Sequence, residues 1–380
     1  MQVVTVSTST GQTRYYLAND DGTPVEPVLQ YLKFRDNGGA ARNTLRLACI
    51  FLKHYFTYLD KRGLRWQAAT IDDLADFLAW LKYPRIDEKV IPLNLEPKYR
   101  AETINAILDT VLAFYHYEYL RGGLGNDVSE RLVTFIKRPH GAYRSFLEGI
   151  ADRRRTKRHL LRLPTPKHVL RTVAKEDVEA VMEACVNIRD YFLMYLLFET
   201  GMRIGEALSL WLEDFDISDR QIRIVDRGEM ENLAEIKTVS SPRTLDCTND
   251  LMEVFTEYIC YFHTESTPTN HVFVKIQGRN AGKAMNYTDV DNLFRQIRRK
   301  TGIYITPHMF RHTSLSMLSS AGWEPELLRK CAGHKNIYTT LNTYVHPSEE
   351  EVTAAFEEAA ERFRLPGKEA EECSLKEVRH

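Results

Sequence analysis

Residues 303–346 read IYITPHMFRHTSLSMLSSAGWEPELLRKCAGHKNIYTTLNTYVH, and their pattern predicts three short helices that close on one point. Thr306 can cap a helix whose first position is Pro307, which is a favourable way to begin a helix. His308 and Arg311 are three residues apart on that helix, so they share a face near its positive end. The first helix therefore presents an imidazole and a guanidinium together.

The second and third helices of this stretch bring further polar side chains to the same place. Gly322 ends the first helix, and the second ends at Gly333, which His334 follows directly. The third opens near Asn336 and carries Tyr344 on its last turn. Two histidines, an arginine and a tyrosine in so few residues indicate a site for an anion, although each residue alone has an ordinary structural explanation.

The composition describes a globular chain with room for two domains. Its 380 residues exceed one ordinary core, and 43% hydrophobic with 27% charged residues excludes a disordered chain. No apolar run reaches the length of a membrane span, and the first residues, MQVVTVSTSTG, lack a signal-peptide pattern. The six cysteines are scattered without metal spacing, so we expect reduced thiols in a cytoplasmic protein.

Neither the net charge nor a nucleotide-binding motif identifies a binding partner of the protein. The net charge of −1 neither requires nor excludes nucleic acid, so the local distribution of charge decides. The sequence has no GxxxxGK[ST] loop and no GxGxxG turn after a predicted strand. We therefore expect no nucleotide-driven chemistry and no cofactor.

The first 148 residues predict a short hairpin and then a helical domain. Residues 1–25 alternate like two short strands, without a core of their own. Across 26–148 apolar residues recur at helical spacing, most clearly in Leu45, Cys49, Leu52, Phe56 and Leu59. Off this stripe, a candidate basic face is formed by Arg42, Arg46 and Lys53. Basic faces of this kind are usually only solvated. The more specific alternative is that this helical domain binds DNA.

Residues 149–172 change in composition and predict a linker. Five positive residues fall within six positions, namely Arg153, Arg154, Arg155, Lys157 and Arg158. Pro164 and Pro166 follow and disfavour a helix. A basic linker is often only a soluble one, but a linker that crosses a polyanion has the same composition.

The second domain is predicted over 173–347. Its apolar run at 191–198 predicts a buried helix, which Gly201 ends. The next helix begins at once, with Arg203 at its start and Glu206 one turn later. The pair is thereby placed at a helix junction.

A small sheet and a terminal segment complete the chain. Short alternating runs predict antiparallel strands at 221–225, 234–238 and 243–247. Lys237 lies on the second of these, where a lysine is nearly always only solvated. Residues 348–380 predict a final helix to about residue 363 and an acidic tail.

Six residues of four types follow one another in a fixed order along the second domain, and this order resembles the tyrosine recombinase family. These phage-integrase-like enzymes include Cre, lambda integrase and the Xer recombinases. Their signature of Arg, Lys, His-x-x-Arg, His and Tyr is met here by Arg203, Lys237, His308, Arg311, His334 and Tyr344. The flanks TGMRIGEALSLWLEDFD, TPHMFRHT and GHKNIYTTLNTYVH match too, and the last is most similar to recombinases of Gram-positive mobile elements.

The resemblance covers 173–350 closely and 26–140 only in helical pattern. It implies a mainly α fold with a small antiparallel β-sheet, in which a helical core-binding domain and a catalytic domain clamp DNA. The implied activity is site-specific recombination of integrase or transposase type, through a covalent 3′-phosphotyrosine intermediate. About 25 residues precede the helical domain, too few for the arm-site-binding domain of lambda-type integrases. Accessory-site binding therefore does not follow.

Each residue type suits phosphodiester chemistry. Cleavage builds negative charge on the non-bridging oxygens, which the forked donors of Arg203 and Arg311 would stabilise. The resemblance makes Tyr344 the nucleophile, and Lys237 the donor of a proton to the departing 5′-oxygen. No metal is implied.

The resemblance also implies supporting roles and partners. His308 would accept or orient the tyrosine proton, and His334 would donate to a phosphate oxygen. Glu206 would orient Arg203 or the lysine strand. The implied partner is double-stranded DNA at specific sites, bound by a homotetramer on paired sites, with accessory proteins left open and no membrane.

The final helix is the expected connector between protomers. Residues 348–364 place on one face Val352, Ala355, Phe356, Ala359 and Phe363. This face would pack either on its own catalytic domain or on a neighbour, and the resemblance favours the neighbour.

Several alternatives stay open. Tyr338 is a second tyrosine near the site, but only Tyr344 has the family's spacing from His334. We take His312 and His346 as neighbours that do not participate. His308, His312 and His334 have the residue types of a metal site, but no carboxylate joins them at helix spacing and HxxRH is not a zinc motif. A type IB topoisomerase or telomere-resolving enzyme shares the chemistry, and a non-catalytic DNA-binding protein shares the fold.

Overall fold

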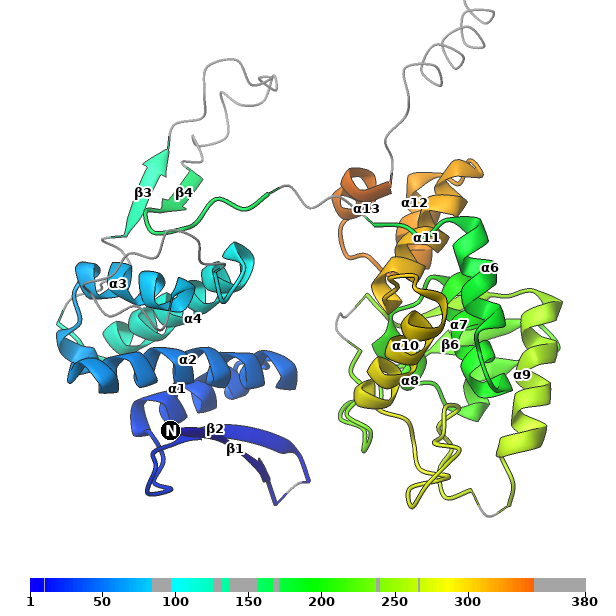
Figure 1. Cartoon of the computed structure of the whole chain (residues 1–380), viewed down its shortest axis with the longest axis horizontal. Coiled ribbons are helices and arrows are strands. Elements are labelled where there is room, and N and C mark those ends of the chain that lie inside the picture. The colour runs from blue at the N-terminus through cyan, green and yellow to red at the C-terminus, as the bar shows by residue number, and fades with distance from the viewer. Residues whose placement is uncertain are drawn as a thin grey trace, which may run out of the picture. The chain divides into compact units, whose positions relative to one another are not determined.

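The computed structural model describes residues 1–9, 11–83, 97–125, 132–136, 156–166, 171–236, 240–265 and 267–344. The chain divides into two compact units, unit 1 over 1–168 and unit 2 over 169–380 (Figure 1). Helices dominate the described parts of both, and the strands form small antiparallel sheets, as predicted. No helix in these described parts is long and apolar enough to cross a membrane.

Unit 1 is a helical layer with a hairpin packed on it. The hairpin predicted for residues 1–25 is confirmed: β1 (Gln2–Ser7) pairs antiparallel with β2 (Thr13–Ala18). Its residues Tyr15 and Leu17 are buried in the same core as the helices. The helices are α1 (Glu26–Asn37), α2 (Arg42–Arg62), α3 (Ile71–Lys82) and α4 (Ala101–Leu120).

The core of unit 1 is rich in aromatic rings whose polar atoms are paired inside. The predicted apolar stripe of α2 is buried along its whole length. The hydroxyl groups of Tyr55 and Tyr115 lie 2.5 Å apart, and the Tyr115 hydroxyl donates to the Trp66 carbonyl at 2.7 Å. Burial raises the pKa of both tyrosines, so this core stays neutral.

Part of the predicted linker 149–172 belongs to unit 1, which corrects the sequence interpretation. β4 (Thr156–His159) pairs antiparallel with β3 (Val133–Ile136). Beyond it, Asn105 on α4 donates to the Leu163 carbonyl and accepts from the Leu163 amide, both at 2.9 Å. A buried amide that satisfies both backbone groups fixes this segment, which its prolines and charges do not predict.

Unit 2 is built around the predicted buried helix. α7 (Ile188–Thr200) packs against α9 (Asn249–Phe262) and α11 (Pro307–Ser320). Five of its apolar side chains are fully buried, namely Phe192, Leu193, Met194, Leu196 and Leu197. The buried helix α7 thus supports α11, which carries the predicted site residues His308 and Arg311.

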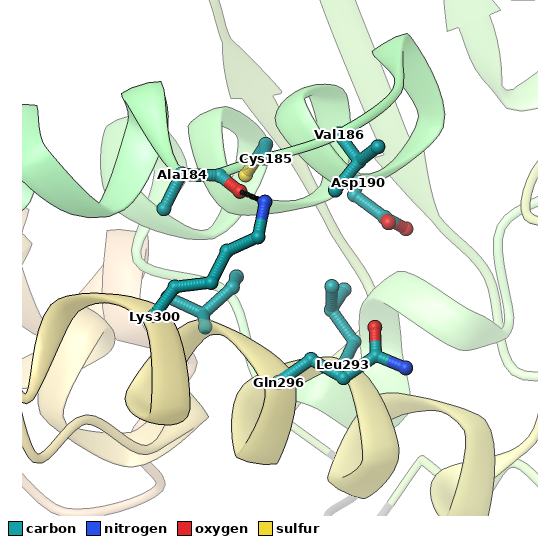
Figure 2. Close-up of a pocket in the computed structure, with 8 residues that line it drawn as sticks. Ala184, Cys185, Val186, Asp190, Leu293, Gln296 and Lys300 are labelled. Atoms are coloured by element: carbon teal, nitrogen blue, oxygen red, sulfur yellow. Dashed lines mark hydrogen bonds between the residues drawn. The ribbon is translucent and has the colours of Figure 1, made fainter.

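Two more helices close unit 2 on another side. α6 (Lys175–Glu183) contacts α10 (Tyr287–Thr301), and a small pocket lies between the end of α6 and α10 (Figure 2). Lys300 reaches across this pocket and donates to the Ala184 carbonyl at 3.1 Å. Asp190, which also lines it, is bound by Arg189 and Asn187 at 2.8 Å each. The Lys300 bond therefore links α10 to the C-terminal end of α6, while the Asp190 bonds stay within the start of α7.

The small sheet of unit 2 differs from its prediction. Its order is β5 (Phe215–Asp216), β6 (Gln221–Ile224) and β7 (Arg243–Asp246), so 215–216 supplies a strand that was not predicted. The predicted strand 234–238 is wrong over 234–236, which pair with no strand among the described residues. Asn232 explains this, since its amide bonds the Leu208 and Met285 carbonyls at 2.9 Å and accepts from the Ala234 amide at 3.0 Å.

Candidate active site

Arg203 is placed by the junction of two helices. Gly201 ends α7 in the left-handed conformation, with φ of 59°, and α8 (Ile204–Leu208) begins three residues later, as predicted. The backbone amide of Arg203 donates to the Glu206 carboxylate at 2.8 Å, and its guanidinium does so at 2.8 Å as well. The carboxylate therefore fixes both the backbone and the side chain of Arg203.

Glu206 is a buried carboxylate shared by two arginines. Its side chain is 1% exposed, and Arg243 on β7 bonds its two oxygens at 3.1 and 3.0 Å. Burial alone raises the pKa of Glu206, but the hydrogen bonds and charges of Arg243 and Arg203 lower it to about 2. The carboxylate is thus ionised at neutral pH and bonds both arginines as an anion.

Arg243 is a site residue that sequence reasoning missed. Its Nε donates to the Cys331 carbonyl at 2.8 Å, which ties β7 to α12 (Pro325–Ala332). Gly333 ends α12 with φ of 61°, and a Cβ there would lie 2.8 Å from the Arg243 guanidinium. The available signal was local: an arginine at the first position of the predicted strand 243–247, directly after Ser241 and Pro242.

Arg311 is the most deeply buried cation of the site. It lies on α11, which the Thr306 side chain caps as predicted, and it is 2% exposed. Its guanidinium donates to the carbonyls of Gly201 at 2.7 Å and Ala332 at 2.5 Å. Burial and then the charge of Arg203 lower the pKa of Arg311 to about 10, so it stays a cation at neutral pH.

His334 lies between Arg311 and the last helix. Its Nε2 is 3.2 Å from the Arg311 guanidinium, and its Nδ1 is 3.0 Å from the Thr340 hydroxyl. A guanidinium only donates, so Nε2 accepts and the ring proton sits on Nδ1. Burial, and then the charges of Arg311 and Arg203, lower the pKa of His334 to about 4. His334 is therefore neutral at pH 7.

Tyr344 ends α13 (Ile337–Tyr344), the third helix predicted for the opening stretch. Its side chain is 8% exposed, and its ring stacks on that of His334 with centroids 6.3 Å apart and planes within 7°. Burial raises the pKa of Tyr344, while the positive charges of Arg311 and Arg203 oppose that rise. Tyr338 on the same helix is 66% exposed, so only Tyr344 faces the arginines.

His312 contacts the Tyr344 hydroxyl, although the sequence alone suggested that it only lies near the site. Its Nδ1 lies 2.8 Å from that hydroxyl oxygen. His308, one turn earlier on α11, is exposed, and its ring centroid is 5.5 Å from that of His312. Spacing alone could not separate the two imidazoles, because the packing of α13 decides which one is covered.

The remaining predicted residues are only partly described. Lys237 and His346 lie outside the described residues, as do Arg153, Arg154 and Arg155. Only the backbone of Lys157 and Arg158 is described, in β4.

One DNA-binding candidate on α2 is wrong, and two others keep some solvent access. Arg42 is 6% exposed and donates to the Tyr15 hydroxyl at 3.2 Å, so it is a core residue and does not belong to a basic face. Arg46 is exposed and Lys53 is half-buried. The hairpin that covers α2 removes Arg42 from the surface, which its helical position alone does not reveal.

The charges of the site favour an anion. Among the described residues, Arg203 and Arg243 bond the Glu206 carboxylate directly, and the charge of that carboxylate also acts on Arg311. Three cations against one anion leave an excess of two positive charges beside a tyrosine hydroxyl. Uncompensated buried charge is costly, so a bound phosphate would be strongly favoured.

Comparison with known proteins decides the family. Residues 171–351 match the model of the phage integrase family. The chain is also 33% identical over 350 residues to transposase A from transposon Tn554 of Staphylococcus aureus, covering 92% of this chain and 94% of the relative. The chain belongs to the phage integrase family. It is a tyrosine-type site-specific DNA recombinase, and the expected likeness to Gram-positive mobile elements is confirmed.

More distant relatives match over most of the chain. The tyrosine recombinase XerA of Pyrococcus furiosus is 22% identical over 83% of this chain and 87% of its own length. The structure of the Tn1549 transposon integrase, solved with a circular intermediate DNA, aligns with a TM-score of 0.59 at 18% identity. It covers 88% of this chain and 99% of that one, which shows that the recombinase fold extends over both units.

Proposed function

We propose that the site around Tyr344 cleaves and rejoins DNA through a covalent 3′-phosphotyrosine. The observation that carries this assignment is the position of a buried tyrosine hydroxyl beside an excess of positive charge. Tyr344 is 8% exposed, and the charge of Arg311, followed by that of Arg203, opposes the rise that burial causes in its pKa. A phosphate held by these arginines would bring its phosphorus next to the nucleophile.

The arginines are proposed to bind the non-bridging oxygens of the scissile phosphate. Arg203 reaches the Gly333 carbonyl and the Ser241 hydroxyl only at 3.4 Å, so these long bonds are easily exchanged for a phosphate oxygen. Arg311 keeps its fork through the Gly201 carbonyl at 2.7 Å. Planar donors held in place by backbone carbonyls need little reorganisation when charge develops.

Two further groups are proposed to move protons or bind oxygen. Lys237 would protonate the departing 5′-oxygen, which the family order of residues supports. The Nε2 atom of His334 now accepts from Arg311 at 3.2 Å. If Arg311 turns that N–H to phosphate, His334 can shift its proton to Nε2 and donate, since it is neutral at pH 7. Attack of a foreign 5′-hydroxyl on phosphotyrosine then rejoins strands.

We propose that residues 26–148 bind the core site and that 173–347 perform the chemistry. Double-stranded DNA is the proposed partner, and solved relatives of this fold contain it, as in the Tn1549 integrase complex. The proposed backbone contacts come from Arg46 and Lys53 and from the basic run of Arg153, Arg154, Arg155, Lys157 and Arg158.

Two strand exchanges on two duplexes need four nucleophiles, so the proposed working species is a homotetramer on paired sites. Residues 348–364 are the proposed connector. Deletion of 349–380 should leave single-site binding intact and abolish synapsis. Tetrameric complexes of the truncated protein in sedimentation on two-site DNA would exclude this connector.

The covalent intermediate provides the direct test. We expect protein produced in cells to retain DNA through a denaturing purification, and sequencing of that DNA to identify the site. Tyr344→Phe removes only the nucleophilic oxygen, so it should bind the recovered site without retaining it. Tyr338→Phe, an exposed tyrosine of the same helix, is the matched control and should behave as wild type. Retention of DNA by Tyr344→Phe would contradict the assignment.

A further inference from the structure

The two histidines of α11 differ in their relation to Tyr344. His312 places Nδ1 at 2.8 Å from the tyrosine hydroxyl, and the two ring centroids are 5.7 Å apart. His308 is exposed one helical turn away. A general base has to lie within hydrogen-bond reach of the proton that it takes, and 2.8 Å meets that requirement.

We infer that His312, and not His308, accepts the proton of Tyr344 when the tyrosine attacks. The inference rests on the proposed function of Tyr344 and adds the identity of its base. His308 would then act elsewhere, on the exposed side of α11. His312 touches the reacting oxygen, so it would be a catalytic residue.

The geometry of Tyr344 is constrained from two sides, which makes a specific acceptor useful. The Ser319 hydroxyl donates to the Tyr344 carbonyl at 3.0 Å, and the Tyr344 ring stacks on His334. With backbone and ring held, the hydroxyl stays within hydrogen-bond distance of Nδ1 of His312. Burial also raises the pKa of Tyr344, so the free phenolate is scarce at neutral pH and a base is needed.

The alternative bases around the hydroxyl are weaker choices. His334 directs its Nε2 to Arg311 and its Nδ1 to Thr340, so both ring nitrogens are engaged. Arg311 is a cation and has no lone pair to accept a proton. The titratable groups that face His312 are His308 on its own helix, Tyr344 on α13 and His334 after α12.

The proposed step balances without another reagent. The O–H bond of Tyr344 breaks and its proton passes to Nδ1 of His312, while the phenolic oxygen bonds to phosphorus. The bond from phosphorus to the 5′-oxygen breaks, and that oxygen takes a proton from the general acid proposed above. On rejoining, His312 returns its proton to the departing phenolate.

The test uses a tyrosine that ionises more easily. Fluorinated tyrosine introduced at position 344 has a lower phenol pKa, so it depends less on a base. His312→Asn keeps a hydrogen-bonding group where Nδ1 lies but cannot take a proton. With ordinary tyrosine it should lower single-turnover cleavage by about 10²-fold or more. With fluorinated tyrosine most of that loss should disappear.

His308→Asn on the same helix is the matched control. Any loss that it causes should be the same with both forms of tyrosine, since fluorination replaces a base and not a DNA contact. Rescue of His308→Asn in place of His312→Asn, or an equal defect of His312→Asn with both nucleophiles, would overturn the inference. The substrate is a nicked duplex that carries the site recovered with the wild-type adduct.

A measurement without DNA separates this inference from the proposed function. The fluorine resonance at position 344 in the DNA-free protein should follow the titration of His312 and lose that response in His312→Asn. An unchanged response would overturn the inference while leaving Tyr344 as nucleophile. Absence of any wild-type adduct would instead defeat the proposed function, whatever the resonance shows.

Discussion

In the core of unit 1, the buried hydroxyls of Tyr55 and Tyr115 bond to one another at 2.5 Å. In unit 2, the buried carboxylate of Glu206 instead holds Arg203 and Arg243. Both arrangements give buried polar atoms hydrogen-bond partners away from water. The tyrosine pair is neutral, whereas the arginine cluster has more positive than negative charge. A neutral bond contributes to stability alone, while the charged cluster also prepares a site for an anion.

We expect the largest loss of stability from a substitution of Glu206. In Glu206→Gln two arginines lose their common counter-charge, so unit 2 should lose about 3–5 kcal/mol of unfolding free energy. Urea denaturation of the full chain, followed by circular dichroism, measures this. Glu213→Gln, at an exposed position of the same unit, is the control and should have little effect.

The same residue predicts a pH dependence. The folded-state pKa of Glu206 of about 2 lies below its ordinary value of 4.5. Its stabilisation is therefore fully present above pH 4.5 and is lost as the pH falls toward 2. The difference between wild type and Glu206→Gln should shrink over this window, and a difference that stays constant would show that Glu206 acts through packing only.

The next effect concerns the chemistry that the charged cluster prepares. Arg203→Lys and Arg311→Lys keep the charge but lose the fork, so each should slow cleavage by about 10²-fold or more, on the order of 3 kcal/mol. Single-turnover cleavage measures it, with the exposed Arg223→Lys as control. A near-normal rate in either variant would show that the arginine contributes only to stability, as Tyr55 and Tyr115 do in unit 1.

A sharper distinction comes from Lys237, whose proposed role is proton transfer. Lys237→Ala should cleave ordinary DNA about 10²-fold more slowly. A substrate with sulfur at the 5′-bridging position should restore the rate, because a thiolate leaves without a proton. Arg203→Lys should not be rescued in this way. Equal defects of Lys237→Ala on both substrates would remove it from that role.

The smallest effect is predicted in the neutral core of unit 1. Tyr115→Phe removes the hydroxyl that joins Tyr55 to the Trp66 carbonyl, so it should cost about 1 kcal/mol of unfolding free energy. The rate of covalent-adduct formation, measured well below unfolding, should not change. Tyr119→Phe, which is 39% exposed, is the stability control. A slower adduct rate in Tyr115→Phe would contradict the division between the units.

Local features were within reach of the sequence. The Thr306 cap, the glycine ends of α7 and α12, and the buried run of α7 depend on neighbouring residues, and the structure confirms them. The ordered residue types pointed to the family for the same reason, since they can be read without knowing what packs against what. Caps, turns and apolar periodicity depend on interactions over a few residues, so they can be predicted from the sequence.

Long-range partners were decided only by the tertiary structure. Glu206 and Arg243 are 37 residues apart, and Arg203 and Gly333 are 130 apart, so no local pattern joins them. Arg42 sits on a helix like Arg46, yet the hairpin buries it. His308 and His312 occupy the same helix with equal chemistry, and the docking of α13 alone places the hydroxyl against His312. Which surface another element covers depends on the packing of the whole core, and that packing is what assigns a role to each of two similar residues.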